Sequence, residues 1–261
     1  MIKFFRKIRQ NLLMENKTGK YFKYAVGEIV LVVIGILIAL QINNWNEQRK
    51  QDKLENEYYC RLLEDVQQDI EQIERLEALS RERLIEANDA LRLLNLENTS
   101  KIEIGRKMGN SIKAIYSDFT PNSSAFEDLK SGANLNIIKD KNIIKALNNY
   151  FKKVEEYLSV IKVNSENAVG LFFNQKDLFA NGWVDAGMEP NGRLYLGLEK
   201  DVYDAMPKDK DSFITSHMKE RLYNETLVYV SSNHRHIELY GFMRDEINLL
   251  YEVLEPKCIN Q

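Results

Sequence analysis

The stretch IVLVVIGILIAL at residues 29–40 decides the fold, because it is an unbroken run of apolar residues. With Ala25–Gly27 before it and Ile42 after it, the segment has about 18 residues, which extend roughly 27 Å as a helix. This length is enough to cross the hydrocarbon core of a bilayer. We therefore predict a transmembrane helix over residues 25–45.

The residues that flank this segment favour a membrane span over the buried helix of a soluble protein. Tyr21, Phe22 and Tyr24 precede it and Trp45 follows it, and aromatic side chains of this kind gather at both interfaces of a membrane. A cleaved signal peptide is disfavoured, because some 24 residues precede the apolar run and no A-x-A-like cleavage site follows it.

Basic residues predict the orientation of the span. A single acidic residue, Glu15, stands before it, against these basic ones: Lys3, Arg6, Lys7, Arg9, Lys17, Lys20 and Lys23. The positive-inside rule then places residues 1–24 in the cytoplasm and residues 46–261 outside it, which in a Gram-negative cell means the periplasm. Such a protein would lie in the inner membrane as a single-pass protein.

Residues 1–24 also carry a pattern of their own. Apolar residues recur at helical spacing, apart from the basic ones, at Ile2, Phe5, Ile8 and Leu12. This pattern predicts a short basic amphipathic helix on an anionic lipid surface. The alternative interpretation is a disordered basic tail that only sets the topology.

Glu28 is the one charged residue inside the span, and it shares a helical face with Gly35 and Ala39. Ionisable residues inside a bilayer are costly and are candidates for function. Gly35 and Ala39 form a small-x-x-x-small pair, which allows two helices to approach closely. One interpretation is that this face contacts another helix, in a homo-oligomer or in another inner-membrane protein. A plain anchor with Glu28 reaching to the headgroups is the alternative.

The chain beyond the span predicts an all-α, elongated helical bundle with an irregular insertion before the last helix. Helices are expected at about 48–96, 101–117, 140–179 and 212–255, with Asp140 and Ser212 as N-caps of the last two. A further short helix is expected to open with a capping box at Ser124 and to close at Gly132. Two apolar seams follow heptad spacing. The first has positions 66, 70, 73, 77, 80, 84, 87, 91 and 94, and the second has positions 222, 226, 229, 233, 236, 240, 243, 247, 250 and 254.

Both seams contain polar residues near their middle. Glu77 and Ser80 lie in the first seam, and Thr226, Asn233 and His236 lie in the second. If the two helices are antiparallel neighbours, these groups lie at a similar depth and need buried partners. A pair of His236 and Glu77 lining a ligand cavity is one interpretation. A polar layer that sets the register of the helices is the other.

Two further features could connect or extend the bundle. Cys60 and Cys258 are the only cysteines, and a disulfide between them would close a very long loop, worth at most about 5 kcal/mol in the chain-entropy model; two free thiols are the alternative. Residues 181–211 are rich in glycine and long for a connection. Trp183, Tyr195 and Tyr203 within them are candidate partner contacts, or else they plug the end of the bundle.

Composition and motifs exclude some classes of function. Basic residues beyond the first 25 positions are interspersed with acidic ones, and the net charge is −3, so nucleic acid is not expected as a partner. The chain contains no G-x-S-x-G, H-E-x-x-H or C-x-x-C motif and has only three histidines. We therefore predict no enzymatic activity, no metal site and no cofactor.

Two stretches carry a resemblance to a known family. They are MIKFFRKIRQNLLMENKTGKYFKYAVGEIVLVVIGILIALQINNWNE at the start and SSAFEDLKSGANLNIIKDKNIIKALNNYF at 123–151. Together with the long helices around them, they resemble an uncharacterised family of single-span membrane proteins common in Bacteroidota. The resemblance implies an inner-membrane protein, and it brings no activity, cofactor or catalytic residue.

These observations predict a membrane-anchored periplasmic module for interaction or assembly, in contact with membrane lipid. A ligand-sensing ectodomain that signals through the membrane helix is the first alternative. A periplasmic enzyme is the second.

Overall fold

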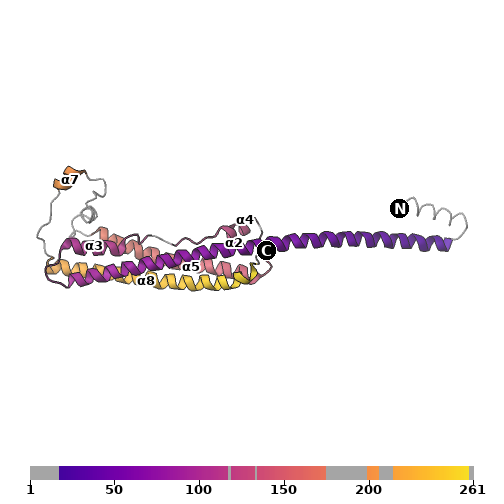
Figure 1. Ribbon diagram of the computed structural model, residues 1–261. Helices are drawn as coiled ribbons and strands as arrows, with labels where there is room; N and C mark the ends of the chain where they lie inside the picture. Colours follow the sequence, from indigo (N-terminus) through magenta and orange to yellow (C-terminus); the bar gives the residue numbers. More distant parts are fainter. Residues whose placement is uncertain (1–17, 117–118, 133, 175–198, 206–213, 259–261) are drawn as a thin grey trace. The chain divides into compact units, whose positions relative to one another are not determined.

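The computed structural model describes residues 18–116, 119–132, 134–174, 199–205 and 214–258. The chain divides into two compact units, residues 1–57 and residues 58–261. The described residues form helices and the turns between them and contain no strand, which confirms the predicted all-α class (Figure 1).

The first unit contains the start of helix α2, which begins at Thr18, continues into the second unit and ends at Leu94. The helix is long and apolar enough to cross a membrane, and its most apolar window, near the N-terminus, is not buried at all. Large side chains from Val26 to Ile42 are exposed. Because water-soluble surfaces rarely leave so contiguous an apolar patch uncovered, this exposure supports a membrane anchor.

The second unit is a bundle built by the rest of α2 and by the elements that follow it. These are α3 (Lys101–Ile112), α4 (Ser124–Ser131), η1 (Asn134–Ile137), α5 (Lys141–Phe173), α7 (Lys200–Ala205), α8 (Ser216–Leu254) and η3 (Glu255–Lys257). Glu77 and Arg83 of α2 bond to Arg244 and Asn233 of α8, so these two helices run antiparallel. Helix α7 is the described part of the predicted insertion at 181–211.

The core of the bundle consists of two hydrophobic clusters. The first cluster joins residues 58–76 of α2 to α4, to the first part of α5 and to the last part of α8. The second cluster joins residues 87–94 of α2 to α3, to the last part of α5 and to the first part of α8. Residues between the two clusters are buried as well, but they are mainly polar.

The predicted seam of α8 is confirmed in full, whereas the predicted seam of α2 is confirmed only in part. Every predicted position of the α8 seam is buried. On α2, the predicted positions 66, 73, 80, 87 and 94 are buried. At the predicted positions 70, 77, 84 and 91, the residue at the centre of the seam is instead the preceding one: Asp69, Leu76, Arg83 and Ala90. Glu77 is buried as well. At positions 69 and 83 the fold thus buries a charged residue where the prediction had chosen the apolar neighbour, Ile70 or Leu84.

Two of the four predicted helix-end roles need correction. Ser124 does not cap α4: the N-cap is Ser123 without a side-chain bond, and the Ser124 hydroxyl and the Ala125 amide both donate to the carboxylate of Asp65 on α2. The predicted cap at Ser212 lies outside the described residues, and Thr215 caps α8 through the Met218 amide.

The other two end roles concern Asp140 and Gly132. Asp140 caps α5 as predicted, accepting from the amide of Asn142. Gly132 follows α4, but with φ −75° rather than a left-handed conformation. A Cβ there would lie 2.5 Å from the side-chain nitrogen of Asn134 and 3.1 Å from the carbonyl oxygen of Asp128, so a larger residue would require the Asn134 side chain to move.

Candidate functional site

A polar layer separates the two hydrophobic clusters and crosses all four long helices of the bundle. Its members are buried and come from α2, α3, α5 and α8: Ser80, Arg83, Ser111, Ser165, Ser232, Asn233 and His236. Because unpaired buried polar groups cost free energy, the bonds they make decide whether the layer is a structural element or an open site.

Arg83 is the centre of this layer and is only 4% exposed. Its guanidinium donates to the hydroxyl of Ser80 at 2.8 Å, to the side-chain oxygen of Asn233 at 2.9 Å and to the carbonyl of Ala114 at 3.1 Å. No described carboxylate forms a salt bridge with it. Burial lowers the pKa of Arg83, and the nearby Tyr240 and Glu82 oppose this effect.

The carbonyls that receive Arg83 lie just after the C-terminal end of α3, at Lys113 and Ala114. A helix C-terminus carries partial negative charge and leaves carbonyls unpaired, so a guanidinium is a suitable cap there. Ala114 adopts a φ of 54°, a left-handed conformation that is unfavourable for a residue with a Cβ. The buried cation is therefore matched by the end of a helix rather than by an acid.

Asn233 completes the layer from α8. Its amide nitrogen donates to the carbonyls of Ser111 at 2.8 Å and Tyr229 at 2.9 Å, while its oxygen receives Arg83. The side chain thus links three helices, α2, α3 and α8. Ser165 of α5 adds a bond to the carbonyl of Ile115 at 3.2 Å.

The structure does not bring together the predicted pair of Glu77 and His236. Glu77 instead accepts from Arg81 of its own helix and from Arg244 of α8. His236 is fully buried, and no described residue forms a hydrogen bond of normal geometry with its ring nitrogens. Burial and then the Arg83 guanidinium lower the pKa of His236 to about 4, against a smaller opposing effect of the Ile161 backbone.

Of the predicted polar groups, the structure brings Ser80 and Asn233 together, and it does so through Arg83. Sequence reasoning missed Arg83, because it took Leu84 as the seam residue. The heptad count offered a signal, since position 83 keeps 3-4 spacing with 80 and 87. Thr226 is also buried, but its hydroxyl donates to the Leu222 carbonyl of its own helix.

A second buried charge of α2, Asp69, lies two heptads before Arg83. One carboxylate oxygen accepts from the amide and the side chain of Asn122 at 2.8 and 3.0 Å, and the other accepts from the hydroxyl of Tyr150 at 2.7 Å. Burial raises the pKa of Asp69 to about 6, although these three bonds act in the opposite direction. Through these bonds, Asp69 links α2 both to the connection before α4 and to α5.

Cys60 of α2 and Cys258, just after η3, form a disulfide, with Cα atoms 4.8 Å apart. This separation is within the usual range for disulfides. The bond spans 198 residues of sequence and lies beside the first hydrophobic cluster.

The remaining predicted contact residues lie elsewhere. Glu28, Gly35 and Ala39 belong to α2 in the first unit, and nothing lies within 4 Å of the place where a Gly35 Cβ would be. Trp183 and Tyr195 lie outside the described residues. Tyr203 belongs to α7, but its side chain also lies outside what the structure describes.

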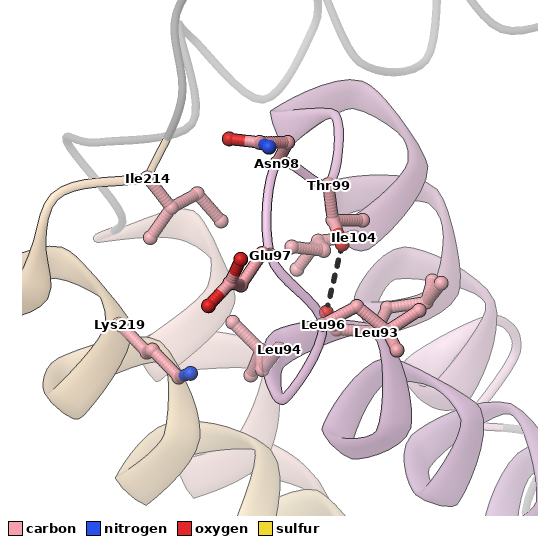
Figure 2. Close-up of a pocket in the computed structure, with 9 residues that line it drawn as sticks. All are labelled: Leu93, Leu94, Leu96, Glu97, Asn98, Thr99, Ile104, Ile214 and Lys219. Atoms are coloured by element: carbon pink, nitrogen blue, oxygen red, sulfur yellow. Dashed lines mark hydrogen bonds between the residues drawn. The ribbon is translucent and has the colours of Figure 1, made fainter.

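A pocket of about 250 Å³ lies where α2 ends and α8 begins (Figure 2). Leu93, Leu96 and Ile214 supply the apolar part of its lining, and Glu97 and Lys219 bring a carboxylate and an ammonium group to it. In the turn beside it, Thr99 donates to the carbonyl of Leu93 at 3.0 Å. Nothing in the sequence pattern predicted this pocket, because its lining combines a turn with residues more than 100 positions away.

Over the described ranges, no group of three or more His, Cys, Asp and Glu side chains could hold a metal ion. The chain belongs to the Family of unknown function (DUF6090), whose profile matches residues 28–180, more than half of the sequence. The match covers part of the candidate membrane segment, the buried charges of α2, and α3 to α5. No curated protein and no solved structure matches the chain.

Proposed function

We propose that this member of the Family of unknown function (DUF6090) is a membrane-anchored module that displays its helical bundle in the periplasm for interaction or assembly with another inner-membrane protein. The basic residues before the span support the cytoplasmic N-terminus and the periplasmic bundle. The exposed apolar segment of α2 supports contact with membrane lipid.

The observation that carries the proposal is a row of exposed apolar side chains on α8. Phe242, Leu249 and Val253 are 42%, 59% and 38% exposed. Their spacings of seven and four place them on one face of the helix. We call these three residues the α8 stripe. Tyr157 of α5 extends it, with its ring centroid 6.0 Å from that of Phe242.

The charges beside the α8 stripe indicate its partner. Exposed Asp245 and Glu252 accompany the stripe and form no salt bridge with a described residue. Acidic neighbours around an apolar row fit the apolar face of a helix with basic flanks. The partner that we propose is therefore a basic amphipathic helix of a neighbouring membrane protein.

Photocrosslinking in native membranes tests this proposal. A p-benzoylphenylalanine at position 249 of the full chain should crosslink to a basic amphipathic helix of another membrane protein, identified by mass spectrometry of the joined peptides. The same probe at exposed Glu74 of α2 is the control. Crosslinks to a second copy of this chain, or equal yields at the two positions, would contradict the proposed partner.

The face of Glu28, Gly35 and Ala39 remains a second contact that we propose, inside the membrane. Glu28→Ala together with Gly35→Leu should abolish in-membrane crosslinking between helices, because a leucine prevents close approach. Crosslinking that is unchanged in this variant would leave the segment as a plain anchor.

A ligand-sensing ectodomain is the second candidate function. It is favoured by the pocket, which lies at the end of the same helix, α2, that contains the candidate membrane span.

A further inference from the structure

We propose that the pocket between the end of α2 and the start of α8 binds a small zwitterion with an apolar side chain, of the size and chemistry of an aliphatic amino acid. The inference does not rest on the α8 stripe, so its failure would leave the proposed interaction function standing.

The charges of the pocket are the first argument. Figure 2 shows the Glu97 carboxylate between Ile214 and Leu94, and Lys219 of α8 lines the same pocket. Neither side chain forms a salt bridge or a hydrogen bond with another described residue. One negative and one positive group that face the same space, without pairing to each other, suit a ligand that carries both charges.

The helix ends are the second argument, because the partial charges of these ends have the same signs as the side chains of Glu97 and Lys219 beside them. Leu93 and Leu94 are the last residues of α2, whose C-terminal end carries partial negative charge, and Glu97 follows this end. Lys219 lies in the first turn of α8, whose N-terminal end carries partial positive charge. The ammonium of a ligand is therefore expected beside Glu97 and its carboxylate beside Lys219. Helix α3 also begins nearby, but only Ile104 from it lines the pocket.

The size and the floor of the pocket define the rest of the ligand. The apolar part of the lining comes from exposed Leu96 and half-buried Leu93 and Ile214, because Leu94 and Ile104 are only 2% and 1% exposed. The volume of about 250 Å³ is below the roughly 300–1,000 Å³ of sites for drug-sized molecules. An aliphatic side chain of a few carbons fits both properties.

The test uses the full chain in phosphatidylcholine nanodiscs and follows L-leucine by saturation-transfer NMR. Binding of leucine at millimolar concentration is expected. L-leucinamide, which lacks the carboxylate, and N-acetyl-L-leucine, which lacks the ammonium, should each bind about fivefold more weakly, as expected for the loss of one exposed charge pair. Glycine, which lacks the apolar side chain, should not compete.

Substitutions of Glu97 and Lys219 test which charged group of the ligand each residue binds. Glu97→Gln should weaken leucine and leucinamide about fivefold and leave N-acetyl-leucine unchanged, and Lys219→Met should weaken leucine and N-acetyl-leucine but not leucinamide. Exposed Glu103→Gln and Lys162→Met are the controls. The proposal is overturned if leucine gives no saturation transfer, if the blocked analogues bind as tightly as leucine, or if the pocket variants behave like the controls.

Discussion

The two ends of the bundle are held together by different means. The end with the first hydrophobic cluster has the disulfide of Cys60 and Cys258 and the buried bonds of Asp69. The end with the second cluster has no cysteine and contains the pocket. Between them lies the layer of Arg83. The difference suggests that the first end is fixed, and that a ligand would act at the second end, where only non-covalent contacts must change.

Removing the disulfide should have the largest effect on stability and should reduce the difference between the two ends. Cys60→Ala with Cys258→Ala is expected to lower the free energy of unfolding by up to about 5 kcal/mol, because the unfolded chain loses a crosslink over a very long loop. Urea unfolding of the full chain in detergent, followed by circular dichroism, measures the change.

Hydrogen exchange shows which end responds to the same double variant. Amides around Leu62 and Leu250, in the first cluster, should lose more protection than those around Leu222. Reductant should destabilise the wild type and leave the double variant unaffected. Equal loss of protection at both ends would show that the disulfide does not distinguish them, and full thiol labelling of the unreduced wild type would show that it does not form.

Disrupting the polar layer is expected to cause the next largest loss in the free energy of unfolding. Asn233→Leu should destabilise the bundle by about 3 kcal/mol, because it removes the acceptor of a buried guanidinium and the donor to two buried carbonyls. Arg83→Met combined with Asn233→Leu should cost less than the sum of the two single changes. A double-mutant cycle by urea unfolding measures this coupling, and strict additivity would mean that the two side chains act independently.

Asp69 and His236 should respond to pH in opposite directions. The folded pKa of Asp69, about 6, is above the ordinary value of 3.8, so its contribution to stability is present below pH 3.8 and is lost as the pH rises through 6. The folded pKa of His236, about 4, is below the ordinary 6.5, so its contribution is present above pH 6.5 and is lost as the pH falls through 4. Each amounts to about 3 kcal/mol, and in the wild type the two largely offset each other.

Single substitutions at Asp69 and His236 should therefore reveal how the contribution of each group to stability depends on pH. Asp69→Asn should produce a protein that loses about 3 kcal/mol, relative to the wild-type profile, as the pH falls from 6.5 to 4. His236→Leu should produce the reverse, a protein that is more stable at pH 4 than at pH 6.5. Free energies of unfolding at half-unit pH steps give the difference from wild type. Parallel profiles for all three proteins would refute both buried titrations.

Much of the fold could be predicted from the sequence, because apolar periodicity reports burial wherever packing is apolar. The exposed apolar helix of the candidate span, the long helices and the whole seam of α8 follow from it. It failed at Asp69 and Arg83, where periodicity alone favoured Ile70 and Leu84. Their burial depends on partners such as Tyr150, which is 81 positions from Asp69, and a local pattern contains no information about such partners.

The pocket could not be predicted for a related reason. Glu97 and Lys219 line the same pocket only because one helix ends and an antiparallel helix begins there, and in the sequence each is indistinguishable from an ordinary surface charge. The disulfide was one of two interpretations that the sequence allowed, since the chain has only two cysteines.

The smallest expected effect compares the N-caps at the two ends. Thr215 caps α8 at the second end, and Thr215→Ala should cost about 1 kcal/mol, because the Met218 amide loses its acceptor. Asp140 caps α5 at the first end and also forms a salt bridge with Lys257 at 3.2 Å. Asp140→Ala should therefore cost more than Thr215→Ala at pH 7.

The pH dependence of these two variants sharpens the comparison. Lys257 and then the Asn142 amide lower the pKa of Asp140, so its stabilisation is present above pH 3.8 and is lost as the pH falls below it. The gap between Asp140→Ala and Thr215→Ala should accordingly narrow in acid, because the hydroxyl of Thr215 does not titrate. Thermal unfolding of both variants and the wild type at pH 7 and pH 3 measures the gap. A constant gap would mean that the Asp140 charge adds nothing to its cap, and that the first end relies on its disulfide and buried bonds alone.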